Sequence, residues 1–91
     1  MNMQNIFLDQ AIAVISDYQM SNLLGVSAEW KNDTAIITYF FKSLPTEEEI
    51  ETVQFASSEI IAGIPECPVD EIITTVKGFL PTNVKSWAYR R

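Results

Sequence analysis

Residues 24–41, LGVSAEWKNDTAIITYFF, decide the expected fold of this chain. Apolar and polar residues alternate over 24–30, which is typical of a strand with one buried face. Residues 34–41 are rich in β-branched and aromatic side chains, which favour strands. Between the two segments lie Asn32 and Asp33, which tolerate the positive φ that a tight hairpin turn needs. The stretch therefore predicts a β-hairpin.

The second strand of this hairpin has apolar side chains on both faces. Ile36 and Phe40 point to one face, while Ile37, Tyr39 and Phe41 point to the other. Helices that pack on one face of a sheet bury only that face. The other face therefore needs its own cover, which a second copy of the chain or a partner protein could supply.

Helical periodicity predicts a helix on each side of the hairpin. The first is expected from residue 3 to about residue 20, and its apolar stripe comprises Phe7, Ala11, Val14 and Tyr18. The second follows residues 45–49, where Thr46 can cap the first turn and Glu49 can complete a capping box. Gly63 is a suitable end for this helix. Its apolar stripe comprises Ile50, Val53, Ser57, Ile60, Ile61 and Ile64.

The C-terminal third predicts one long and one short strand. Residues 69–80, which end at Leu80, alternate as a strand does, and Gly78 suggests a bulge or bend. Residues 84–89 predict a last short strand that has Trp87 and Tyr89 on one face.

The expected element order is α-β-β-α-β-(β), and the expected fold class is α+β. We expect residues 1–91 to form a single globular domain, in which two helices pack on one face of a mostly antiparallel sheet of three to four strands. The helix between the second and third strands is long enough for a crossover, so one strand pair could be parallel.

The composition excludes several classes of function. Twelve acids against six bases give a net charge of −6, so nucleic acids and anionic membranes are not expected as partners. The chain has no histidine, which removes the usual base of nucleophilic catalysis and a common metal ligand. Its three scattered glycines form neither a P-loop nor a dinucleotide fingerprint. We therefore expect no enzyme activity, no cofactor and no metal site.

The single cysteine and the N-terminus indicate a cytoplasmic protein. Cys67 has no partner for an internal disulfide and no histidine to activate it, so we expect a packed or incidental loop thiol. The first residues lack the basic segment of a signal peptide. The apolar runs are much shorter than the ~20 residues that span a membrane.

Two groups of acidic residues are candidates for binding a partner. One lies in the opening turns of the second predicted helix, where the helix dipole also favours acids. The other lies near the end of that helix and the start of the third strand, where the dipole does not explain them. Each group could be solvated surface, an electrostatic docking patch or a cation site, the last being disfavoured by the spacing. The predicted partner-binding residues are Glu47, Glu48, Glu51, Glu59, Glu66, Asp70 and Glu71.

The last eleven residues, 81–91 (PTNVKSWAYRR), are locally basic in an acidic chain. With the small size, the acidity and the absence of histidine, this ending resembles bacterial immunity proteins, in particular those of contact-dependent growth-inhibition and related toxin systems. The resemblance implies a protein that binds one cognate toxin domain, often a nuclease, and blocks its active site or substrate groove. An acidic chain would be steered to the basic surface of such a toxin.

A second interpretation is a non-catalytic homo-oligomeric structural or regulatory subunit, for example a homodimer. The doubly apolar strand over residues 35–41 favours it. A small enzyme that uses carboxylates or tyrosine is the least supported interpretation, because the motifs for it are missing.

Overall fold

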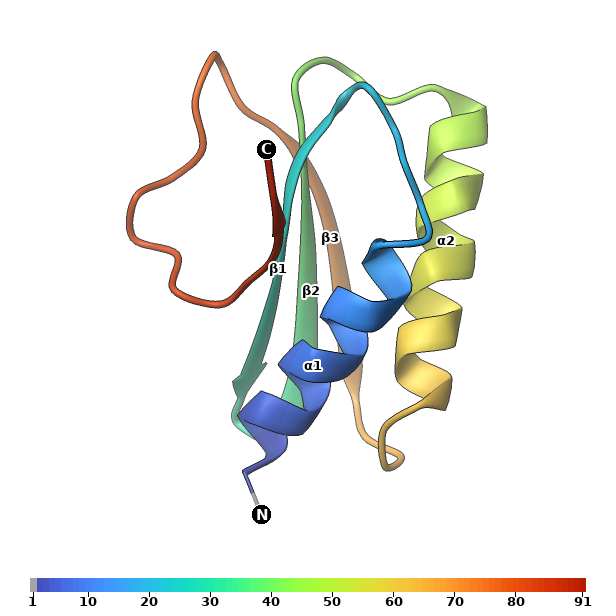
Figure 1. The fold of residues 1–91 in the computed structure, drawn as a ribbon, viewed down its shortest axis with the longest axis vertical. Coiled ribbons are helices and arrows are strands. Elements are labelled where there is room, and N and C mark those ends of the chain that lie inside the picture. The colour runs from blue at the N-terminus through green and yellow to red at the C-terminus, as the bar shows by residue number, and fades with distance from the viewer. Residues whose placement is uncertain (1) are drawn as a thin grey trace.

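The computed structural model describes residues 2–91. Its elements are, in order, α1 (Met3–Ile15), β1 (Leu23–Lys31), β2 (Thr34–Phe41), α2 (Glu47–Ala62), β3 (Val69–Thr75) and β4 (Trp87–Arg90). The strands form one sheet in the order β3-β2-β1-β4. β1 is antiparallel to β2 and β4, whereas β2 and β3 are parallel. The α+β class and the element order are confirmed, and the sheet is mixed because α2 returns the chain to start β3 in the direction of β2 (Figure 1).

The hairpin forms around two residues with positive φ, as predicted. Asn32 and Asp33 have φ values of 53° and 58°. The flanking residues Lys31 and Thr34 are paired, so the turn has two central residues. Such a turn places both central residues in the left-handed region, which Asn and Asp enter at lower cost than most residues.

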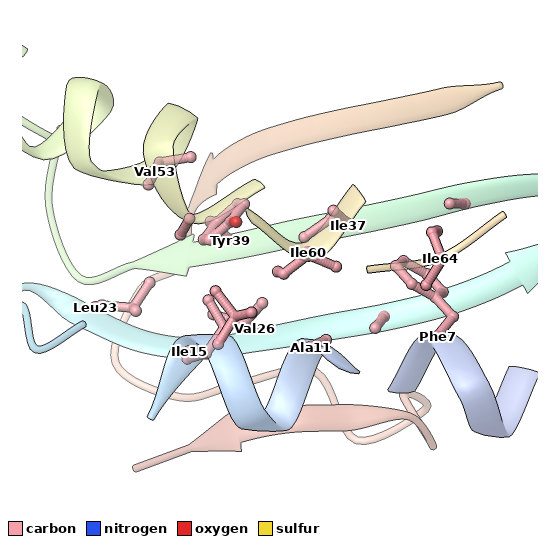
Figure 2. Packing of buried hydrophobic residues seen from close by; sticks show 14 of the residues in the cluster. Phe7, Ala11, Ile15, Leu23, Val26, Ile37, Tyr39, Val53, Ile60 and Ile64 are labelled. Atoms are coloured by element: carbon pink, nitrogen blue, oxygen red, sulfur yellow. The ribbon is translucent and has the colours of Figure 1, made fainter. Parts of the chain in front are cut away.

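Both helices contribute to one core on the same face of the sheet. α1 packs on β1 and β4, and α2 lies beside it on the β3 side of the molecule (Figure 1). Figure 2 shows labelled side chains of α1, α2, β1 and β2 meeting between these elements. The largest fully buried side chains are Tyr39, Phe7, Phe41, Ile15, Leu23, Ile37, Ile60, Val26 and Val53.

α1 ends at Ile15, whereas the periodicity predicted an end near residue 20. The hydroxyl of Ser16 donates to the Ala13 carbonyl oxygen at 2.8 Å. The N–H groups of Asp17 and Tyr18 bond to carbonyl oxygens three residues earlier, at 3.0 Å. Such short-range bonds tighten and end a helix. Tyr18 still packs against the core, so its apolar role was predicted correctly although it lies outside the helix.

A bulge at the start of β1 changes which leucine is buried. The register with β2 shifts between Leu23 and Gly25, which makes Leu24 an extra residue. Leu23 is therefore buried at 1% exposure, while Leu24 is only half-buried. Val26 and Ala28 are buried, as the alternation predicted. Alternation alone places Leu24 on the same face as Val26 and Ala28, because it does not reveal a bulge. It also predicted a single buried face for this strand, which was wrong, since Gly25 and Ser27 on the other face are buried as well.

The two C-terminal strands are shorter than predicted. β3 ends at Thr75 rather than Leu80, and the last strand covers Trp87–Arg90. Residues 76–86 form a loop between the two strands, which are opposite edges of the sheet (Figure 1). Gly78 has a φ of 89° in this loop, a conformation that glycine adopts without steric cost.

Trp87 and Tyr89 lie on opposite faces of the sheet, not on one face as predicted. The register of β4 against β1 shifts between Val26 and Ser27. Tyr89 consequently packs against the core, whereas Trp87 lies on the helix-free face.

The helix-free face of β2 is covered in part by the chain itself. The ring of Trp87 lies 5.4 Å from the ring of Phe40, at an interplanar angle of 60°. A Cβ atom on Gly25 would come within 2.8 Å of the Trp87 ring, so glycine makes room for this packing. Phe40 is only 7% exposed. Phe40 is thus covered by Trp87 of the same chain, and not by the second copy or partner protein that was expected to cover this face.

Tyr39 makes the stability of the fold sensitive to alkaline pH. Its side chain is fully buried, and its hydroxyl lies 2.8 Å from that of Ser57. Burial raises the pKa of Tyr39 to about 12, against about 10 in an unfolded chain. The native state therefore holds this proton more tightly, and its contribution to stability is fully present below about pH 10.

We expect the free energy of unfolding to fall by up to ~1.4 kcal/mol per pH unit between pH 10 and 12 because of this group. Urea denaturation at pH 9 and pH 11 measures the decrease. Tyr39→Phe combined with Ser57→Ala, which leaves no buried hydroxyl unpaired, should show a smaller decrease. An equal decrease in both proteins would contradict the role of Tyr39.

Candidate partner-binding surface

Acidic residues gather along α2, the loop after it and β3. Residues 43–76 contain eight of the twelve acids and none of the six bases. Residues 77–91 contain four of the bases and no acid. Since β3 and β4 are opposite edges of the sheet, the acidic α2–β3 side and the basic β4 edge lie apart (Figure 1). The fold therefore separates charges that the sequence places in neighbouring segments.

The seven predicted residues are here called the acidic surface: Glu47, Glu48, Glu51, Glu59, Glu66, Asp70 and Glu71. All seven side chains are exposed. They are spread along α2, which is about 24 Å long, and over the following loop and β3. Within residues 2–91, no three acidic or thiol side chains form a group that could hold a metal ion. Such a spread suits contact with an extended surface.

At the start of α2, one glutamate caps the helix and its neighbours do not. The Thr46 hydroxyl accepts a bond from the Glu49 N–H at 3.1 Å, and the Glu49 carboxylate accepts one from the Thr46 N–H at 2.9 Å. This is the predicted capping box. Glu47, Glu48 and Glu51 take no part in it, and only the first two lie in the first turn, where the dipole favours them.

Glu59, near the end of α2, has a structural partner that the sequence did not predict. Its carboxylate accepts a hydrogen bond from the Tyr18 hydroxyl, and its backbone oxygen accepts one from the Gln10 side chain at 3.3 Å. The bond to the carboxylate raises the pKa of Tyr18 above its ordinary value, because it stabilises the protonated hydroxyl. Glu59 thus links α2 to α1 through Gln10 and to the segment after α1 through Tyr18, while its side chain remains exposed.

The other three acids do not form one cluster. Asp70 pairs with Ile36 and Glu71 pairs with Ile37 in the parallel register. Because Ile37 faces the core, Glu71 lies on the helix side of β3 and Asp70 lies on the opposite face. Glu66 lies in the preceding loop. The predicted second acidic group therefore extends around the β3 edge.

The single cysteine, Cys67, lies in the loop between α2 and β3. Cys67 is a free cysteine that is half-buried and packs against the core, as predicted for a packed loop thiol.

Sequence analysis missed Phe55, which lies in the acidic part of α2. Its side chain is 60% exposed. At ~100° per residue, it projects within about 40° of Glu48, Glu51 and Glu59 around the helix axis. The available signal was its spacing, because Phe55 stands outside the apolar stripe and has a glutamate four residues away on each side.

Comparisons with known proteins place the chain in a family. Within residues 2–91, no helix combines the length and the apolar character that crossing a membrane requires. A search of curated proteins found no match. A family model described as the MafI2 immunity protein matches residues 11–91, a range that includes Phe55 and all seven residues of the acidic surface. This confirms the resemblance to small bacterial immunity proteins of polymorphic toxin systems. The chain belongs to the MafI2 immunity protein family.

Proposed function

We propose that this immunity protein neutralises a nuclease toxin. Its acidic surface binds the basic substrate groove of the toxin and blocks it. The observation that carries the proposal is the run of eight acids without a base over residues 43–76. A nuclease holds the phosphate backbone with Lys and Arg side chains. Carboxylates form charge-assisted hydrogen bonds with the same side chains, so they can occupy the positions of phosphates.

The size and charge of the molecule suit this mode of inhibition. A standard interface buries ~800 Å² of each partner, about one seventh of the 5788 Å² that the chain exposes. Opposite charges on the two partners raise the association rate, which is useful for an inhibitor that must act before the toxin reaches its substrate.

Within this proposal the chain is non-catalytic and acts in the cytoplasm, where nucleic acid would be the toxin's target. The competing interpretation, a homo-oligomeric subunit, depended on an uncovered apolar face of β2. Trp87 packs against Phe40 in the same chain, so that face gives weaker support for a second copy.

Coexpression tests the proposal directly. The probe is the C-terminal domain of the reading frame immediately upstream of the gene for this chain, as the candidate toxin domain, expressed from a separately inducible promoter. We expect it to stop growth alone, and to copurify with the chain and be harmless when both are expressed. Purified chain at equimolar concentration should also stop the toxin from cleaving RNA or DNA. Growth arrest despite coexpression, or unhindered cleavage by a complexed toxin, would contradict groove blocking.

A further inference from the structure

The side chain of Phe55 is 60% exposed and does not belong to the core. Val53 and Ile60 of α2 are buried in the core (Figure 2). At ~100° per residue, exposed Phe55 lies on the opposite side of the helix from these two residues. The solvent face of an amphipathic helix is normally polar. A large aromatic side chain at this position therefore contributes nothing to core packing.

The surroundings of Phe55 resemble the anatomy of a binding interface. Glu48, Glu51 and Glu59 surround it on the outer face of α2, and all three are exposed. Protein interfaces commonly have an apolar centre inside a polar rim, and aromatic centres often dominate the binding energy. The same outer face thus supplies an apolar centre and a charged rim.

Resting on the proposed function, we infer that Phe55 is the apolar anchor of the toxin contact. Its ring enters an apolar pocket of the toxin domain, and Lys or Arg side chains at the mouth of that pocket bind the surrounding glutamates. An Arg side chain held by a glutamate can also stack on the ring.

The charges around Phe55 favour a basic partner over a second copy of this chain. Two copies that met through α2 in a symmetric dimer would present the same surface to each other. Glu48, Glu51 and Glu59 of one copy would then approach the same three residues of the other, and like charges in an interface are unfavourable.

Phe79 offers a matched control on the same molecule. It is 81% exposed, which is more than Phe55, and it lies in the segment that carries four bases and no acid. If exposed aromatic area alone attracted the toxin, both phenylalanines would contribute. If the acidic rim matters, only Phe55 contributes.

The experiment measures the dissociation constant of the chain for the toxin domain encoded beside its gene, purified from the coexpressed complex. We expect Phe55→Ala to weaken binding by about 30- to 100-fold, mainly through faster dissociation. Phe79→Ala should stay within about twofold of the unsubstituted chain. Both variants should unfold at nearly the unchanged temperature, since neither ring is buried.

Other outcomes separate this inference from the proposed function. Suppose that Phe55→Ala binds as tightly as the unsubstituted chain, while Glu48→Gln with Glu51→Gln weakens binding. The proposed binding through the acidic surface is then supported, and the role of Phe55 as an anchor is contradicted. If the unsubstituted chain does not bind the toxin domain, both fail. If sedimentation shows a dimer that Phe55→Ala dissociates, the occupant is a second copy and the inference is overturned.

Discussion

Reversing three charges on the outer face of α2 should abolish protection against the toxin. In the variant Glu48→Lys, Glu51→Lys and Glu59→Lys, we expect the dissociation constant to rise about a thousand-fold, which is ~4 kcal/mol of binding free energy. Like charges brought together in an interface cost several kcal/mol, and the electrostatic steering of association is lost as well. Growth rescue and surface-based kinetic measurements check both effects.

The control variant carries the same change in net charge elsewhere. Asp9→Lys, Asp17→Lys and Glu29→Lys also bring the chain from −6 to zero, and these three side chains are exposed outside the acidic surface. This variant should lose only the long-range electrostatic attraction to the toxin. Its association rate should fall a fewfold at low salt, and its dissociation rate should not change. Equal loss of affinity in both variants would mean that net charge, rather than the α2 surface, governs binding.

Replacing Trp87 with alanine should lower the free energy of unfolding by about 3 kcal/mol. Truncating a buried Trp or Phe costs ~3–5 kcal/mol, and the lower end applies because Trp87 is only partly buried. The substitution exposes Phe40 and leaves a void beside Gly25, where the ring now fits closely. Urea denaturation monitored by circular dichroism measures the change.

Two further variants identify the cause of this loss. Trp87→Phe keeps an aromatic contact with Phe40 and should recover about half of the stability. Phe79→Ala removes an exposed aromatic from the preceding loop and should leave stability unchanged. If Trp87→Ala is as stable as the unsubstituted chain, the C-terminal strand is not what protects the helix-free face.

The predicted acidic residues were all found exposed, but their grouping was not predictable. Consecutive acids on a strand, such as Asp70 and Glu71, point to opposite faces once the strand pairs. The bond between Tyr18 and Glu59 joins residues 41 positions apart, so it depends on how α2 and the segment after α1 meet. The spacing of Phe55 outside the predicted apolar stripe was visible in the sequence, and the structure adds that its side chain is 60% exposed.

Local chemistry was enough to predict the hairpin turn, the capping box and the order of the elements. Asn32 and Asp33 accept positive φ, and Thr46 with Glu49 satisfies the first turn of α2, through contacts between residues close in sequence. Tertiary structure alone decided the bulges in β1 and β4, the faces of Trp87 and Tyr89, and the separation of acidic and basic edges. These features arise from register and strand order, which are set by packing between distant segments and leave no local signal in the sequence.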